Sequence, residues 1–461
     1  MALRTISGET LDIRSPRPIS PDSAEISSSN PCNEHEPHHI GVPDSGRRAW
    51  LVVLGGFLNF TASFGLLNSF GTFEAQYERN LDWPTFIVTW IGSLQMFILF
   101  LSGVLIGPAF DKWGARKLMF SGTFLCLVAF ISCSFATKFY QFLLAQGFLF
   151  GLGCALLFYP TTSAVSEWFD KRRGLALGLV CSGASAGGIL WPMVLDQFFI
   201  RFSAAKTHRL TAAIAIPVLL LSCVLVRERH VRIAGHDMAG NEVKASQTSI
   251  SKAIWDFRFL GLSSALLFIS CGMMVPFFYI PMYAQDNGAA ANTTVANNLL
   301  AISYSASLIG RIFTGWVADH IGRYTTHRSI LKNEADSPRF NMLLLISILT
   351  SLATFSFIWA KTLPTLIAFS VLFGFSSGRI VPLGSACVAQ TTPDMGHLGL
   401  RIGTMMAICS IGTLTGGPAT GAIKEATHTW PGVFIFCGAV TMGGAGILCA
   451  VRMVSSKRLV F

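Results

Sequence analysis

Charged residues are scarce in this chain, at only 13% of its 461 residues, whereas 52% are hydrophobic. A soluble domain usually carries about twice that charged fraction. A soluble chain of this length would fold as roughly three domains, each with a polar surface to cover. Too few polar residues are present to coat such surfaces. The composition therefore predicts a membrane protein with many spans, surrounded by the lipid bilayer.

Motifs that carry enzyme chemistry are also lacking. The chain has no HExxH, no P-loop and no dinucleotide fingerprint, and its 11 Cys residues form no CxxC pair. Gly183-Ala-Ser185-Ala-Gly187 matches GxSxG, but it lies in an apolar run of small residues rather than at a strand-to-helix elbow. We therefore expect no enzyme, no ATP-driven pump, no cofactor and no metal.

The net charge of +10 could indicate nucleic-acid binding in a soluble protein. In a membrane protein it indicates basic cytoplasmic loops instead, so no nucleic-acid partner is expected. No cleavable signal peptide is visible, since residues 1–46 are polar and rich in Ser, Pro, Asp, Glu and His. This segment is predicted to be a disordered cytoplasmic tail.

Apolar stretches of about 20 residues, the length that crosses a bilayer as a helix, recur along the chain. Twelve spans are predicted, six in each half. They cover residues 49–73, 85–107, 117–137, 140–163, 173–199, 210–227, 258–284, 296–318, 340–360, 363–388, 400–424 and 432–452.

A polar stretch divides the spans into two groups of six. The predicted organisation is a six-helix bundle over 47–227, a cytoplasmic central loop over 228–256, a second bundle over 257–454 and a cytoplasmic tail over 455–461. With both termini in the cytoplasm, inner segments hold about 25 of the 34 Lys and Arg residues and outer loops about 7. This asymmetry supports cytoplasmic termini.

One loop motif occurs in both halves, after the second span of each. The first copy runs Gly107-Pro-Ala-Phe-Asp111-Lys-Trp-Gly114-Ala-Arg116, and the second runs Gly315-Trp-Val-Ala-Asp319-His-Ile-Gly322-Arg323. Two bundles with matched loops indicate a duplication, as expected for a transporter whose halves move about a central site.

The repeated loop resembles the cytoplasmic signature of the major facilitator superfamily over about residues 43–454. Three further segments are similar to its monocarboxylate-porter-like branch, fungal type, although Ser45 stands where the branch usually has Gly. They are 43–50 (PDSGRRAW), 167–178 (EWFDKRRGLALG) and 403–421. The resemblance implies an all-α fold of twelve helices in two pseudo-symmetric bundles.

Charges of the repeated loop lie just past predicted helix ends. Asp111 and Asp319, with Arg116 and Arg323 a few residues on, are candidate gating residues, since they can cap helix ends and pair across the seam between halves. The alternative is that they only anchor the helices at the cytoplasmic surface. The sequence leaves both open.

Arg311 lies in the middle of the eighth predicted span, where a charged side chain is costly and normally faces a cavity or a partner. The resemblance assigns this position to an arginine that binds a substrate carboxylate, which the guanidinium fork suits. The alternative is a salt bridge to a buried acid. Arg379, in the Gly- and Pro-rich tenth span, is a second candidate, unless it reaches the membrane surface.

Three further residues complete the predicted substrate site: Asn68, Tyr159 and Tyr279. Asn68 and Ser307 stand where animal members of the resembled branch have a Lys and an Asp. Proton coupling by the animal route is therefore in doubt, and proton coupling by another route stays open. Each tyrosine also fits a packing role.

The function predicted is secondary active transport of a small organic, carboxylated molecule by alternating access, with efflux of a secondary metabolite favoured. The alternatives are uptake of a monocarboxylate or a vitamin-like acid, and a membrane sensor that transports nothing. The predicted location is the plasma membrane. Asn292-Thr-Thr294 is a glycosylation sequon on a predicted outer loop.

Overall fold

A computed structural model describes residues 46–81, 83–169, 172–228, 256–290, 293–328, 338–378, 380–391 and 398–457. The predicted tail, most of the central loop, Arg379, Asn292 and the end of the chain lie outside the described residues, as do the side chains of Asp111 and Arg323. The contacts reported below fall within residues 42–461, which form one unit.

Helices account for every regular element of the described chain, which contains no strand. The first half holds α1 Arg47–Asn68, α2 Phe70–Leu81, α3 Thr85–Leu101, α4 Gly103–Phe135, α5 Phe139–Phe142, the π-helix η1 Leu143–Leu149, α6 Phe150–Trp168, α7 Arg173–Arg201 and α8 Ala204–Leu225. The second half holds α10 Phe257–Met273, α11 Val275–Asp286, α12 Thr293–Arg328, α13 Pro338–Ser356, η2 Phe357–Trp359, α14 Leu363–Ser377, α15 Ile380–Thr391, α16 Leu398–Thr427 and α17 Pro431–Lys457.

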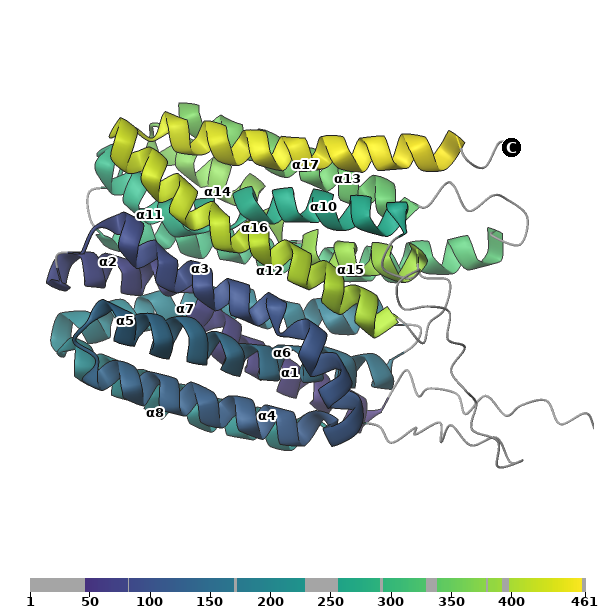
Figure 1. The fold of residues 1–461 in the computed structure, drawn as a ribbon, viewed down its shortest axis with the longest axis horizontal. Helices are drawn as coiled ribbons and strands as arrows, with labels where there is room; N and C mark the ends of the chain where they lie inside the picture. The colour runs from purple at the N-terminus through teal and green to yellow at the C-terminus, as the bar shows by residue number, and fades with distance from the viewer. Residues whose placement is uncertain are drawn as a thin grey trace, which may run out of the picture. The chain divides into compact units, whose positions relative to one another are not determined.

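The helices run back and forth between two ends of the bundle (Figure 1). We call the end that holds the start of α1 and the end of α8 the terminal end. The opposite end, where α2 and α11 finish, is the far end. α1 packs on α7, α7 on α12, and α16 on α3, so elements of the two halves lie against one another.

The all-helical membrane fold predicted from the sequence is confirmed, and the helices cover the twelve predicted spans. Among the described residues, eight helices are long and apolar enough to cross a membrane, and the bent pair Phe86–Leu101 and Gly103–Phe110 makes a ninth. The remaining spans correspond to α12, to the pair α14 and α15, and to α16. Arg311 in α12 and a run rich in Gly and Thr in α16 lower the apolar character of those helices, whereas α14 is apolar but too short to cross a membrane alone.

Both halves begin with a span that is broken. In the first, α1 ends and α2 begins at Ser69; in the second, α10 ends and α11 begins at Met274. Discontinuous helices in transporters occur where backbone lines a cavity. Here each interruption is one residue long, and α1 with α2, and α10 with α11, still form one span each.

Glycines bring the helices of each half together. A Cβ placed on Gly183 or Gly187 of α7 would collide with carbonyl oxygens of α1, and one on Gly412 or Gly416 of α16 would collide with those of α10. Such contact needs residues without side chains, as in GxxxG packing. The GxxxG segments 183–187 and 412–416 are therefore packing surfaces, one in each half.

Candidate functional site

Tyr304, Ser307 and Arg311 lie on one face of α12, because their spacing of three and four residues matches the helical repeat. Tyr304 and Ser307 are buried, and Arg311 is half-buried. This face of α12 packs along α7. Arg311, which the sequence predicted to meet substrate, thus faces the seam between the two halves together with Tyr304 and Ser307.

Arg311 is held by a neighbour from the other half. Its Nη1 donates a hydrogen bond of 2.6 Å to the carbonyl oxygen of Cys181, on α7. Its Nε is buried and has no hydrogen-bond partner. No carboxylate of the described residues forms an ion pair with it, so the salt-bridge alternative finds no support in the described structure.

The end of α14 lies against the same group. A Cβ on Gly378 would come within 3.2 Å of Arg311 Nε and would collide with the hydroxyl of Ser307. That hydroxyl is buried and, like Arg311 Nε, has no hydrogen-bond partner. Gly378 thus keeps clear the space beside two polar groups that nothing in the described structure satisfies. Buried polar groups usually have partners, and exceptions often mark functional sites.

Asn68 joins this group at the break in the first span. Its side-chain amide donates to the carbonyl oxygen of Ala184 on α7 at 3.3 Å, and its own carbonyl oxygen accepts 3.1 Å from the hydroxyl of Tyr304. Tyr304 also stacks on Phe277 of α11, with ring centroids 4.9 Å apart. We call Asn68, Cys181, Tyr304, Ser307 and Arg311 the Arg311 cluster; it joins both halves at mid-helix.

The chemistry of the Arg311 cluster suits an anion. A guanidinium is permanently charged and offers up to five N–H donors in a planar fork that matches a carboxylate. The neighbouring hydroxyl of Ser307 can donate a further hydrogen bond. Sequence reasoning did not select Tyr304 or Ser307 for the substrate site, although their helical spacing from Arg311 is visible in the sequence.

The structure does not join the two predicted tyrosines to this cluster. The hydroxyl of Tyr159, on α6, donates to the carbonyl oxygen of Phe100 at 3.2 Å, where α3 ends. Tyr279, on α11, packs edge-on against Trp430 with centroids 5.6 Å apart and lies towards the far end. The two aromatic rings thus take part in packing, one on each side of the Arg311 cluster.

Asp319 closes the seam at the terminal end. Its two carboxylate oxygens accept hydrogen bonds from the backbone N–H groups of Gly174, at 2.7 Å, and Leu175, at 2.8 Å. These groups belong to the first turn of α7, where N–H groups lack intrahelical partners and the helix dipole favours negative charge. Asp319 of the second half therefore caps a helix of the first. Arg116 is exposed.

The halves also meet at the far end. Gly71 of α2 lies against the backbone of Phe278 of α11, and the rings of Phe70 and Phe278 are 6.3 Å apart. A Cβ on Gly417 of α16 would come within 2.7 Å of Thr89 on α3. Contacts at both ends enclose the Arg311 cluster between them.

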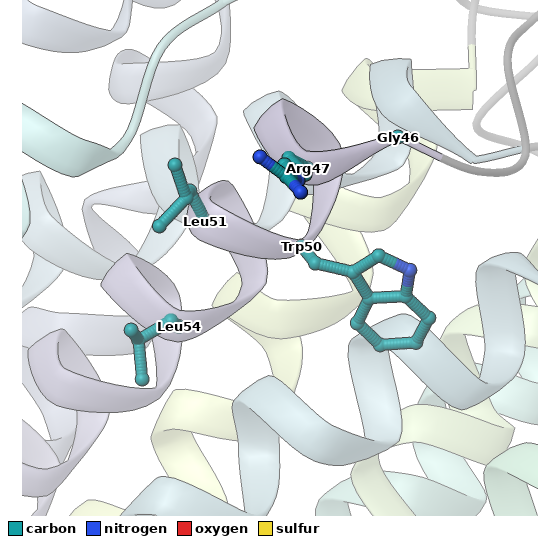
Figure 2. Close-up of a pocket in the computed structure, with 5 residues that line it drawn as sticks. All are labelled: Gly46, Arg47, Trp50, Leu51 and Leu54. Atoms are coloured by element: carbon teal, nitrogen blue, oxygen red, sulfur yellow. The ribbon is translucent and has the colours of Figure 1, made fainter.

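One hollow on the surface lies apart from this cluster, at the start of α1 (Figure 2). It is lined by Gly46, Arg47, Trp50, Leu51 and Leu54, and the last three are more than one third exposed. Its lining is almost entirely apolar, and it offers a carboxylate no more than Arg47. An apolar outer surface of this kind is expected where a helix faces lipid.

Residues 52–331 and 335–459 match the family model described as Major Facilitator Superfamily. The chain is 39% identical to the "MFS-type transporter pynF" of Aspergillus niger over 97% of this chain and 98% of that protein. It is 33% identical to the "Aspyridones efflux protein apdF" of Emericella nidulans, over 91% and 80%. It is 30% identical to the "Fujikurins efflux protein" of Gibberella fujikuroi, over 99% and 93%.

Proposed function

Since the chain belongs to the Major Facilitator Superfamily, we propose that it exports a small, carboxylated secondary metabolite across the plasma membrane by alternating access. The observation that carries this proposal is Arg311, a charged side chain at mid-helix with a buried N–H and no acidic partner among the described residues.

Export is favoured over uptake by the names of the relatives. Two of the proteins described above are named as efflux proteins, for aspyridones and for fujikurins, and a third relative is the "Agnestins efflux protein AgnL12" of Paecilomyces divaricatus. These names concern those proteins. Their identity of 30% to 33% to this chain, over more than nine tenths of its length, supports the same class of task here.

A carboxylated substrate is favoured by the geometry around Arg311. The side chain already donates one hydrogen bond across the seam, to Cys181, so a carboxylate that binds the remaining donors would lie between the halves. Each charge-assisted hydrogen bond contributes about 1.5–3 kcal/mol. A ligand bound there would therefore share the guanidinium with a contact between the halves, so its binding could shift the balance between their arrangements.

Alternating access requires one end of the seam to open while the other stays closed. At the terminal end, opening would break the two hydrogen bonds from the first turn of α7 to Asp319, at a cost of about 3–6 kcal/mol before water replaces them. We assign the terminal end to the cytoplasm, in accordance with the basic inner loops. Asn292 is then external and is proposed as a glycosylation site.

Inside-out membrane vesicles from a host that expresses the chain provide the test. The vesicles are energised with a proton gradient and incubated with a metabolite extract, and the compounds that accumulate are identified by mass spectrometry. The Arg311→Gln variant should lose the accumulated carboxylic acids. Arg209→Gln is the matched control, because Arg209 also makes a side-chain hydrogen bond, to Ser134, but lies outside the cluster.

Equal accumulation of acids by Arg311→Gln and wild type would contradict the proposal. Accumulation in right-side-out vesicles but not in inside-out vesicles would show uptake instead of export. Accumulation in neither, with correctly inserted protein, would favour a sensor.

A further inference from the structure

Glu74 is a buried carboxyl group that lies one residue past the end of the first predicted span. The first span was expected to end at residue 73, but after the bend at Ser69 the helix continues as α2 to Leu81. Glu74 is only 6% exposed. In the described structure its one hydrogen-bond partner is the hydroxyl of Thr89, on α3, which donates at 2.8 Å.

A cation faces this region from the second half. Lys424, on α16, lies with its ammonium 3.8 Å from Asp286 Oδ2 and 4.2 Å from the centre of the Trp430 ring. Trp430 Nε1 also donates to Asp286 Oδ2, at 3.0 Å. The cation is therefore bound to an acid and an aromatic ring of its own half, and within the described structure it makes no hydrogen bond or ion pair with Glu74.

Tyr279 and α16 complete the junction between the halves. A Cβ on Gly421 of α16 would lie 3.7 Å from the hydroxyl oxygen of Tyr279 and 3.8 Å from that of Thr89. The Tyr279 hydroxyl is buried beside the side chains of Thr89 and Thr420. Polar groups of α2, α3, α11 and α16 thus converge at the far-end seam, beside the Phe70–Phe278 contact.

Two charged groups interact electrostatically with Glu74: Glu78, on α2 itself, and Lys424, on α16. Tyr279 is the titratable group that faces Glu74 from α11. On the side of α7, Asp196 interacts with Arg79.

The other polar groups near α2 belong to a separate network on α2, η1 and α8. The Tyr77 hydroxyl donates to Gln146 Oε1 at 2.5 Å and lies 3.3 Å from His208 Nε2. Glu74 faces α3 instead, through Thr89. Its environment is therefore distinct from that of the buried histidine.

We propose that Glu74 is the proton-binding residue of this transporter, and that its protonation keeps the far end closed. A buried carboxylate without an ion pair is costly, and the cost can be removed in two ways. The group can bind a proton and stay enclosed, hydrogen-bonded to Thr89. Alternatively, the far end can open and admit water to the carboxylate.

The consequence for transport rests on the proposed function. With the far end outside the cell, a proton from the medium would bind Glu74, close that end and be carried inward as the terminal end opens. Release of that proton to the cytoplasm would then reset the cycle. Proton entry would thereby be exchanged for export of the organic anion.

Hydrogen exchange measured by mass spectrometry on the reconstituted full chain tests this without any substrate. The peptides to follow cover residues 70–81 and 275–286, at about pH 5.5 and about pH 8, the range in which carboxyl groups in proteins can titrate. After correction for the intrinsic rate at each pH, wild-type exchange should be several-fold faster at the higher pH. Glu74→Gln should exchange slowly at both, with a ratio near one.

Glu425→Gln is the matched control, because Glu425 lies next to Lys424 on α16 but is exposed. It should retain the wild-type pH dependence. A second variant, Lys424→Met, removes the nearest opposite charge, so the opening transition should move to higher pH. This variant keeps the proposal testable if Glu74→Gln does not fold.

The proposal is overturned if Glu74→Gln keeps the wild-type pH dependence, if wild type shows none, or if Lys424→Met leaves the transition in place. Failure of the proposed function would look different. The vesicles would then accumulate no organic anion, while far-end exchange would still depend on pH through Glu74.

Discussion

Arg311 and Arg401 are both poorly exposed arginines in membrane helices, yet the structure predicts opposite consequences for their loss. Arg401 is 1% exposed, and its Nη2 lies 3.0 Å from Asp256 Oδ2, with the guanidinium 4.8 Å from the centre of the Phe259 ring. Arg311 has one carbonyl partner, Cys181, and no carboxylate partner among the described residues. The charge of Arg401 is therefore compensated within the protein, whereas the charge of Arg311 is available to a ligand.

The magnitudes follow from these partners. Removing one member of a buried ion pair costs about 3–5 kcal/mol. Because Asp256 is 34% exposed, Arg401→Gln should fall below that range, at about 1–3 kcal/mol. Arg311→Gln gives up one charge-assisted hydrogen bond, about 1.5–3 kcal/mol, but also removes the cost of burying an unpaired charge, which is several kcal/mol. Its thermal stability should therefore equal or exceed that of wild type.

Transport should show the reverse order. Arg311→Gln should abolish movement of anionic substrate, and Arg311→Lys should weaken binding by about 1–3 kcal/mol, or about 5- to 150-fold, because it keeps the charge but loses the fork. Arg401→Gln should retain transport per folded molecule. The assays are thermal unfolding in detergent and flux per molecule of protein in vesicles.

A lower unfolding temperature for Arg311→Gln than for Arg401→Gln would refute this reasoning. It would mean that a partner within the protein compensates the charge of Arg311, as in a structural salt bridge. Wild-type flux in Arg311→Gln would remove the residue from the substrate site.

Three further predictions concern the terminal end and the topology. Asp319→Asn keeps one acceptor oxygen but loses the charge that caps α7, so hydrogen exchange in the first turn of that helix should accelerate and transport should slow, whereas wild-type values for both would limit Asp319 to anchoring. Gly114→Ala should lower the free energy of unfolding by about 1–2 kcal/mol or more, because Gly114 has a φ of 77° and an added Cβ would also meet the Glu228 carboxylate. An unchanged unfolding temperature would contradict this prediction. Tags at residue 20 and within 228–256 should be reached only from the cytoplasm and a tag beside Asn292 only from outside; a tag on the opposite side would overturn the orientation.

Several features of this protein were determined by its sequence alone. The positions of the spans follow from the length of the apolar stretches. Backbone N–H and C=O groups without hydrogen bonds are too costly in lipid, so a segment of this chain that crosses the bilayer is expected to be a long apolar helix. The duplication was visible in the repeated loop containing Asp111 and Asp319. Arg311 could be singled out because a charge at mid-span is costly wherever its neighbours lie.

The tertiary structure decided which groups those residues meet. Arg311 faces Cys181 and Gly378, and Asp319 faces the start of α7, through contacts that no local pattern encodes because the partners are distant in sequence. Tyr159 and Tyr279 were equivalent candidates in the sequence, yet Tyr159 lies beside the end of α3 and Tyr279 against Trp430.

Glu74 shows the difference most clearly. A carboxylate at the end of an apolar run reads as the start of a loop, since charge normally marks the membrane boundary. The bend at Ser69 lets α2 continue, with Phe70, Phe73 and Tyr77 buried on its inner side. Because burial depends on the helices that pack around a residue, only the arrangement of α2, α3, α11 and α16 could place this acid inside the protein.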